Sequence, residues 1–499
     1  MSLKELYHNK WARFGFWAIL YILWVIWLGN YWWLFGLIPI FDGHITKKVK
    51  WLFWKFQFKE DVVCTSSTKK FQTNKFWTKE FWTSRILHWK SCILQCKNDG
   101  FWKVTKRVLK RIGISLYRWI DALIFATIVV TFLNMFFFQA FKIPSSSMES
   151  SLYTGDHLFV SKLAYGPKLP QTPLTIPFTH NVIAGKESYS TLLQNDYRRL
   201  KGFGHVETGD YVVFAFPHGD TVLVKDPAAD YYTYVRTLGR EYTLKHYGPV
   251  KVRPSDKKDH YVKRCVAVAG DTLTIKDGQV YIGSQPQENW SGVQNSYSVV
   301  TDGRRINPKH LENLGINKSE LWYSAELPGY PAMALTADMV EKVKSFRNVI
   351  SVTANFDSYP ADYPDSDLTI FPFSSDYKWT RDNFGPLWIP AKDATVELTL
   401  KNLPLYERII TSYEGNELEV KDGKIYINSE EVQSYTFKQD YYFMMGDNRH
   451  NSLDSRYWGF VPEDHIVGKP AVIWLSIEGN ERFPRNLKNI RWRRFFKFV

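Results

Sequence analysis

Residues 261–284 read YVKRCVAVAGDTLTIKDGQVYIGS, and this stretch decides the fold class. A β-branched run precedes two shorter alternating runs, which flank a Lys-Asp-Gly turn typical of a β-hairpin. NELEVKDGKIYINS (416–429) repeats the pattern. DYVVFAF (210–216) and YYFMMGDN (441–448) are further strand-like runs, and LTADMVEKVKSF (335–346) is the clearest helical pattern. The sequence therefore predicts a mostly β fold with an antiparallel β-sheet core.

The two hairpin-like segments are interpreted as independent hairpins, with a duplicated domain as the alternative. Between them lies a stretch rich in Pro, Asp and Tyr, which indicates an inserted second lobe at 285–415. We therefore expect a β core in two parts, 142–284 and 416–480.

Two long apolar segments precede the core. Residues 14–41 carry no charge, and residues 119–141 carry one acidic residue, so each is long enough to span a bilayer. The sequence predicts an N-terminal segment with a first transmembrane α-helix at 1–43 and a second transmembrane α-helix at 119–141. A cleavable signal peptide and a buried core helix are the respective alternatives. The length of the first segment and the cations before the second disfavour them.

The net charge of +14 is unevenly distributed. Residues 44–119 hold eighteen Lys and Arg against four Asp and Glu, an excess equal to that of the whole chain. The segment 44–118 is therefore predicted to be a basic cytoplasmic loop, because positive loops stay on the cytoplasmic side. Residues 142–480 are slightly acidic by count, so no nucleic-acid partner is expected. The basic aromatic tail, 481–499, is expected to contact the membrane, and packing on the β core or disorder is the alternative.

Several common catalytic and metal motifs are missing from the sequence. It has no GxSxG, HExxH or Walker motif. Cys92 and Cys96 are spaced CxxxC without a paired His/Cys motif, which favours ordinary thiols over a zinc site. Neither a metal nor a cofactor is expected.

The segment FKIPSSSMESSLYTGDHLFVSK (141–162) begins where the second predicted span ends. Alone it indicates only a polar turn. Two distant segments accompany it, YVKRCVAVAGD (261–271) and GDNRHNSLDSRYWGFVPEDHIVGKP (446–470). Together with TGDYVVFAFP (208–217), they resemble the sequence boxes of the bacterial type I signal peptidases, also called leader peptidases. The match to the last box is the most specific, because more than a dozen fixed positions agree.

This resemblance implies a Ser/Lys dyad, with Ser147 as nucleophile and Lys263 as general base. A serine hydroxyl needs a base beside it. A lysine amine can act only when neutral, and burial lowers its pKa. The apolar surroundings of Lys263 in YVKRCVAVA are suitable. The resemblance also implies Ser145 as a side-chain donor to the oxyanion and Ser452 as the residue that positions Lys263. The other implied site residues are the supporting Asp447, Asn448, Arg449, Asp454 and Arg456, and the substrate-contacting Ile143 and Pro144.

The implied function is a membrane-bound serine endopeptidase that removes signal peptides from exported preproteins. Its expected partners are preproteins with small residues before the cleavage site and the lipid bilayer, and the secretion translocon is a candidate partner. The expected location is the cytoplasmic membrane, multi-pass, with the catalytic domain on the extracytoplasmic side. Two alternatives stay open: a catalytically silent binding or assembly factor of the same fold, and a LexA-like self-cleaving Ser/Lys protein.

Overall fold

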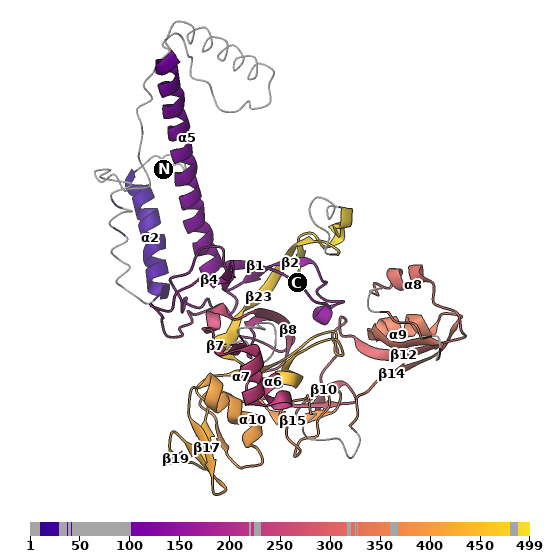
Figure 1. The fold of residues 1–499 in the computed structure, drawn as a ribbon. Helices are drawn as coiled ribbons and strands as arrows, with labels where there is room; N and C mark the ends of the chain where they lie inside the picture. Colours follow the sequence, from indigo (N-terminus) through magenta and orange to yellow (C-terminus); the bar gives the residue numbers. More distant parts are fainter. Residues whose placement is uncertain are drawn as a thin grey trace. The chain divides into compact units, whose positions relative to one another are not determined.

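The computed structural model describes residues 10–28, 37, 41, 101–218, 221–223, 231–316, 321–324, 326, 328–359, 368–479 and 488–499. The chain separates into two compact units, Met1–Phe132 and Leu133–Val499. In the first unit the described elements are α2 (Lys10–Leu28) and most of α5 (Phe101–Phe136). The second unit contains the β-sheets (Figure 1). Most of the predicted basic loop lies outside the described residues.

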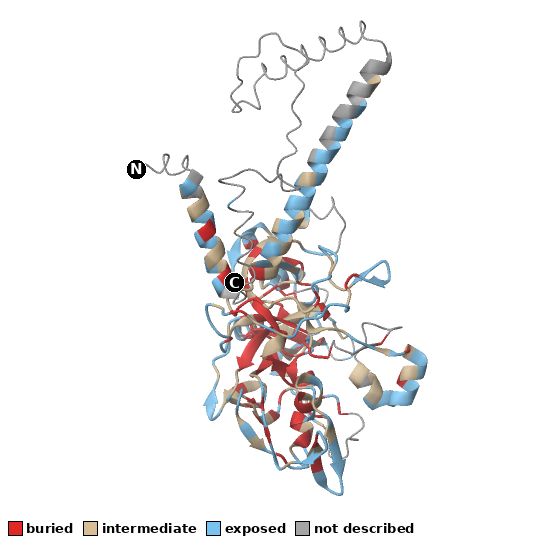
Figure 2. Ribbon diagram, turned by 90° about the vertical axis from the view of Figure 1, so that its left-hand side faces the viewer, coloured by how far each residue is buried: buried red, intermediate tan, exposed pale blue. Residues whose placement is uncertain are grey.

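Helix α5 contains the clearest candidate for a membrane span. Its window Trp119–Phe136 is apolar and long enough to cross a bilayer, and little of it is buried. Figure 2 shows its described surface as largely exposed. In α2 the apolar part, Phe14–Ile26, is shorter. Within this unit the rings of Trp24 and Phe132 lie 5.7 Å apart between centroids. One candidate membrane helix is thus found in the described residues.

The end of the second apolar segment differs from the prediction. The helix ends at Phe136, and Phe138–Lys142 form strand β1 instead of the last helical turn. β1 pairs with β2 along its whole length, from Phe138 opposite Ser161 to Lys142 opposite His157. This pairing satisfies the backbone polar groups without a helix. An apolar run alone does not distinguish a lipid-facing helix from an edge strand whose partner lies elsewhere in the sequence.

The second unit is mostly antiparallel β, as predicted. Its principal sheet has eight strands, and their order is β1-β2-β23-β5-β8-β21-β22, with β24 beside β23. The strands are β1 (Phe138–Lys142), β2 (Asp156–Ser161), β5 (Tyr211–Ala215), β8 (His260–Ala267), β21 (Tyr441–Met445), β22 (Val461–Pro462), β23 (Ile466–Ser476) and β24 (Lys497–Phe498). β5, β8 and β21 correspond to three of the predicted strand-like runs.

The two predicted hairpins are confirmed. β9 (Thr272–Lys276) pairs with β10 (Gln279–Ile282), and β17 (Leu418–Lys421) pairs with β18 (Lys424–Ile427). In both turns an Asp and a Gly adopt positive φ, as a two-residue primed turn requires. The hairpins lie in separate sheets, whose strand orders are β11-β10-β9-β15 and β17-β18-β19. The remaining strands of these sheets are β11 (Gln285–Pro286), β15 (Phe384–Trp388) and β19 (Glu430–Glu431).

Part of the predicted insertion forms a small lobe. Strands β13-β12-β14 make a sheet with its own hydrophobic cluster, to which α8 and α9 contribute. The elements are β12 (Asn295–Thr301), α8 (Pro308–Asn313), β13 (Gly329–Leu335), α9 (Ala337–Lys344) and β14 (Val349–Ala354). Helix α9 confirms the predicted helical pattern at 335–346. However, β15 pairs with β9, so residues 384–388 belong to the sheet of the first hairpin. Within the predicted insertion, only residues 295–354 therefore form a separate lobe with its own three-stranded sheet among the described residues.

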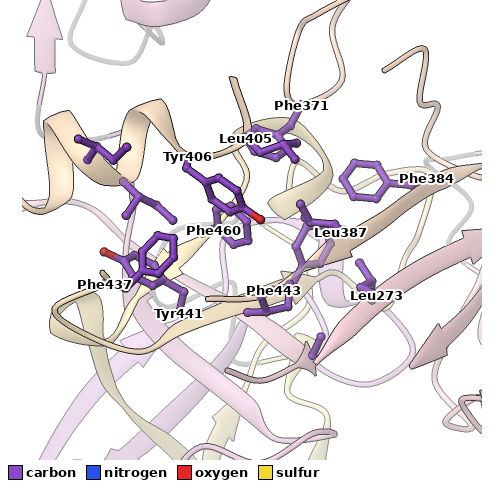
Figure 3. Close-up of a cluster of buried hydrophobic side chains, with 14 of the residues drawn as sticks. Leu273, Phe371, Phe384, Leu387, Leu405, Tyr406, Phe437, Tyr441, Phe443 and Phe460 are labelled. Carbon is purple, nitrogen blue, oxygen red and sulfur yellow. The ribbon is translucent and has the colours of Figure 1, made fainter. Parts of the chain in front are cut away.

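The largest buried cluster joins the later part of the insertion to strand β21 and the residues around Phe460. Phe371, Phe384 and Leu387 pack with Phe443 and Phe460 in this cluster (Figure 3). Aromatic rings bury large apolar areas, so this contact fixes the later insertion against β21. Figure 2 shows buried strands at the centre of the second unit.

Short elements complete the second unit. They are β3 (Val182–Ile183), β4 (Lys186–Glu187), β6 (Thr221–Leu223), α6 (Tyr231–Leu238), α7 (Arg240–Tyr247), β7 (Val250–Val252), β16 (Thr395–Glu397), α10 (Leu403–Arg408), β20 (Ser434–Thr436) and α11 (Ser455–Trp458).

The described part of the basic aromatic tail, 488–499, packs on the principal sheet. β24 pairs with β23, and Arg494 forms a buried ion pair with Asp156 at 2.6 Å. Trp492 and Phe498 nevertheless keep 70% and 80% of their surface exposed. The alternative of packing on the β core is therefore found for residues 488–499, and exposed aromatic side chains remain on that surface.

Candidate active site

Ser147 lies in the short helical turn η3 (Ser146–Met148), directly after β1. The extended chain before this turn is held by Ile143, whose N–H donates to Asp156 O at 2.8 Å. Met148 is completely buried and anchors the other side of Ser147. Ser147 is thus fixed on both sides, and its own side chain is half-buried.

Lys263 approaches Ser147 from strand β8, which lies between β5 and β21 in the principal sheet. Its Nζ donates to Ser147 Oγ at 2.5 Å, although 116 residues separate the two in the chain. Only 2% of the Lys263 surface is exposed. Burial lowers the pKa of Lys263 to about 8, against the opposing effect of the nearby Asp454 carboxylate. A substantial fraction of this amine is therefore neutral near pH 7 to 8 and can accept the proton of the serine.

Ser145 is exposed beside Ser147, and its Oγ lies 3.4 Å from Ser147 Oγ. Pro144 is exposed as well, whereas Ile143 is buried in the hydrophobic cluster that contains Met148 and Leu158. Of the two residues implied for substrate contact, the structure leaves Pro144 the larger accessible surface.

The residues after β21, which we call the catalytic loop (446–451), contact one side of η3. We call η3 the nucleophile turn, after the role that the resemblance implies for Ser147. Asn448 N–H donates to Ser147 O at 3.1 Å, and Asn448 Nδ2 donates to Ser146 O at 3.2 Å. Asn451 Nδ2 donates to Ser146 Oγ at 2.9 Å. A Cβ on Gly446 would lie 2.6 Å from Ser147 O, so the close approach of this loop requires a glycine.

Ser452 lies beside this loop but does not make the hydrogen bond that the resemblance implies. Its hydroxyl is buried, and it has no hydrogen-bond partner among the described residues. In the structure Ser452 Oγ therefore makes no hydrogen bond to Lys263, although it lies close to Gly446 Cα, where a Cβ would clash with it.

Two buried ion pairs support the catalytic loop. Asp454 accepts from Arg456 Nε and Nη2 at 2.9 and 2.8 Å and from the Gly446 N–H at 3.1 Å. Burial opposes ionisation of Asp454, but the charge and hydrogen bonds of Arg456 hold its pKa below the ordinary value. Asp447 accepts two hydrogen bonds from Arg264, at 2.7 and 2.6 Å. Both carboxylates are thus paired in a bidentate manner, which favours a rigid loop.

Arg449 differs from these arginines. It is buried, and its Nε and Nη1 atoms have no hydrogen-bond partner among the described residues. Burial, together with the nearby charge of Arg456, lowers the pKa of Arg449 to about 10. The backbone of Arg449 is well held, since its carbonyl accepts from Arg456 Nη2 at 2.5 Å.

Three residues of this network carry no signal that the sequence alone reveals. Arg264 follows Lys263 directly, so an alternating strand would place it on the opposite face. Its guanidinium carbon lies 4.2 Å from the ring centroid of Tyr211 and 4.5 Å from that of Trp290. Ser151 donates to Asp447, and Asn451 binds the nucleophile turn. The quoted motifs contain all three, but no local pattern specifies their partners.

The comparisons with known proteins agree with this geometry. A family model described as "Signal peptidase, peptidase S26" matches residues 116–318 and 432–475. Signal peptidase I of Helicobacter pylori is 24% identical over 385 residues, which cover 75% of this chain and 90% of the relative. Signal peptidase I of Haemophilus influenzae is 24% identical over 379 residues, covering 75% and 74%. Signal peptidase I of Buchnera aphidicola subsp. Acyrthosiphon pisum is 72% identical over 40 residues, 8% of this chain and 13% of the relative.

The fold, the site and these similarities define a peptide hydrolase. The chain belongs to the signal peptidases of peptidase family S26, and its relatives are of the bacterial type I class.

Proposed function

We propose that this chain is a membrane-anchored type I signal peptidase that uses Ser147 and Lys263 as a catalytic dyad. The observation that carries the proposal is the contact of 2.5 Å between Lys263 Nζ and Ser147 Oγ in a setting that lowers the lysine pKa to about 8. A neutral amine at hydrogen-bond distance from a hydroxyl is the arrangement that general-base catalysis requires.

The proposed reaction has two steps. Lys263 takes the hydroxyl proton of Ser147 as Oγ attacks the scissile carbonyl carbon. The oxyanion accepts hydrogen bonds from the Ser145 hydroxyl and the Ser147 N–H, and such donors contribute a few kcal/mol to catalysis. The Lys263 ammonium then gives its proton to the leaving amine, which leaves an acyl-serine. In the second step Lys263 deprotonates a water molecule, which hydrolyses the ester and restores both side chains.

The proposed substrates are exported preproteins, which are cut after small residues at the end of the signal peptide. Ser147 follows the end of α5 by 11 residues, so a membrane-embedded α5 keeps the nucleophile close to the bilayer surface. This location matches that of the cleavage site of a signal peptide, whose apolar part lies in the bilayer. Pro144 and the backbone of residues 143–145 are the proposed contacts for the substrate segment before the scissile bond.

The proposed topology has two spans, α2 with its apolar continuation and α5. The basic segment 44–118 is cytoplasmic, and the catalytic unit is extracytoplasmic. The exposed Trp492 and Phe498 side chains supply a further membrane contact beside the cations of the tail. Cysteine labelling in intact cells tests this orientation: sites near residue 75 should be protected and sites near 300 accessible. The reverse pattern would contradict both the orientation and the substrate class.

Cleavage of a preprotein in detergent or proteoliposomes tests the dyad. Ser147→Ala and Lys263→Ala should each abolish processing while the protein stays folded. The exposed residues Ser351 and Lys276 provide matched controls, and Ser351→Ala and Lys276→Ala should process at the wild-type rate. Processing by Ser147→Ala at a normal rate would refute the mechanism.

A further inference from the structure

The catalytic loop has two neighbours. On one side Asn448 and Asn451 bind the nucleophile turn, as described above. On the other side the loop contacts the inserted segment 285–415. Gln294 N–H donates to Asp447 O at 2.8 Å, and Arg449 N–H donates to Gln294 O at 2.9 Å. His450 lies between the two asparagines, so whatever holds its ring also holds the residues that bind Ser146 and Ser147.

The imidazole of His450 is fixed in one tautomer by its two partners. The backbone N–H of Ser296 donates to His450 Nδ1 at 3.1 Å. Because a backbone amide can only donate, Nδ1 is an acceptor and the ring proton lies on Nε2. His450 Nε2 in turn lies 3.1 Å from Asp382 Oδ2. Only 1% of Asp382 is exposed, so this hydrogen bond is formed away from solvent.

Residues 381 and 382 hold the backbone of the loop as well as the ring. Arg381 Nη1 donates to His450 O at 3.0 Å, and Arg456 Nη1 donates to Arg381 O at 3.3 Å. Asp382 also accepts from the Asp357 N–H at 2.8 Å. Burial opposes ionisation of Asp382, but its hydrogen bond with His450 helps to hold its pKa below the ordinary value. The inserted segment therefore forms hydrogen bonds with both the side chain and the carbonyl of His450.

A divalent cation is a competing explanation for this cluster, because Asp357, Asp382 and His450 have potential ligand atoms within 4.8 Å of one another. Their hydrogen bonds argue for a different role. Arg381 forms a bidentate pair with Asp357, and its charge already compensates that carboxylate. Nδ1 of His450 is occupied by Ser296, and the proton on Nε2 points toward Asp382. The cluster is thus a closed network of donors and acceptors.

We propose that His450 is a positioning residue, through which the inserted segment holds the catalytic loop in register with Ser147. The proposal rests on the proposed function, and it gives the insertion a role in that reaction. If the Ser296–His450–Asp382 hydrogen bonds are lost, the loop residues Asn448 and Asn451 shift relative to the nucleophile turn. The geometry between Ser147 and Lys263 then departs from the productive one, whereas the surface that binds substrate is unchanged.

The test compares three substitutions of His450 in the full chain. His450→Phe keeps the ring but removes both hydrogen bonds, and kcat should fall about 10- to 100-fold with KM changed less than about twofold. His450→Asn can keep the acceptor for Ser296, and His450→Gln can keep the donor to Asp382, so each should recover part of kcat. His310 is an exposed histidine of the same inserted segment, and His310→Phe is the matched control, with wild-type kcat.

Two further measurements separate positioning from simple loss of fold. Rates are measured well below the Tm of each variant, and Asp382→Ala replaces His450→Phe if the latter does not fold. The double variant of His450→Phe with Asp382→Ala should lose no more kcat than His450→Phe alone, because both changes remove the same hydrogen bond. Wild-type kcat in folded His450→Phe, or losses that multiply in the double variant, would overturn the proposal.

Ser147→Ala is measured in parallel. If Ser147→Ala is active, the proposed function fails. If Ser147→Ala is inactive while the His450 variants have wild-type kcat, only this inference fails.

Discussion

The pH dependence of cleavage gives the sharpest test of the role of Lys263. Burial lowers its pKa from 10.5 to about 8. At pH 7 about one amine in ten is then neutral, about 300-fold more than for an exposed lysine with its ordinary pKa. The value of kcat/KM for a preprotein, measured from about pH 5 to about pH 10, reports the pKa of the free enzyme. We expect kcat/KM to rise tenfold per pH unit and to level off near pH 8.

Substitution of Asp454 tests whether burial and nearby charge set the pKa of Lys263. The carboxylate of Asp454 raises the pKa of Lys263 and so partly offsets the effect of burial. Asp454→Asn removes that charge but keeps an oxygen that can accept from the Gly446 N–H, so the acid limb should move to lower pH. Lys276→Ala, an exposed change, should leave the limb in place. A limb near pH 10 in the wild type, or a limb that moves upward in Asp454→Asn, would refute the account of Lys263 as a buried base.

Three further substitutions test other features of the site. Lys263→Met should abolish activity yet raise the free energy of unfolding at pH 7 by up to about 3 kcal/mol, because the wild-type protein must bury an amine whose pKa is lower in the folded state than in the unfolded state. For the same reason the stability of the wild type should rise with pH between about 8 and 10.5, and denaturant titration at pH 7 and pH 10 should find this pH dependence in the wild type but not in Lys263→Met. Gly446→Ala should reduce kcat about 100-fold at unchanged KM, since its Cβ meets Ser147 O, and a wild-type kcat would show that the close approach is unimportant. Arg494→Met leaves Asp156 buried without its cation and should cost about 3 to 5 kcal/mol of stability, much of which Asp156→Asn should restore in the double variant.

Local features of the sequence predict the hairpins and the helix of the insertion. The Asp-Gly pairs at 277–278 and 422–423 specify turns with positive φ, whatever surrounds them. The pattern at 335–346 contains Thr336, whose side chain caps α9 by accepting from Met339 N–H. Each of these signals acts within a few residues, so the sequence alone is sufficient to recognise it.

The features that the sequence did not predict depend on distant partners. Residues 138–142 form a strand because β2 lies beside them, and β15 joins β9 across more than 100 residues of chain. The pair of Ser147 and Lys263 was expected only through a resemblance to known enzymes, since either segment alone predicts an ordinary turn or strand. The hydrogen bond implied for Ser452 is absent from the described contacts, because residue type does not determine the direction of a hydroxyl. The contact of His450 with Asp382 has no local signal at all.

The ion pair between Asp156 and Arg494 also has a consequence for biosynthesis. The two residues lie 338 positions apart, and the Asp156 carbonyl accepts the hydrogen bond from Ile143 N–H that fixes the chain before Ser147. At about 5 to 20 residues per second, a ribosome needs roughly 20 to 70 s to proceed from one to the other. Throughout that interval Arg494 is not available to neutralise the Asp156 carboxylate, and the catalytic loop is itself translated long after Ser147. A nascent chain therefore carries Ser147 well before the arginine that neutralises Asp156 has been translated, so the order of synthesis separates the appearance of the serine from the assembly of its surroundings.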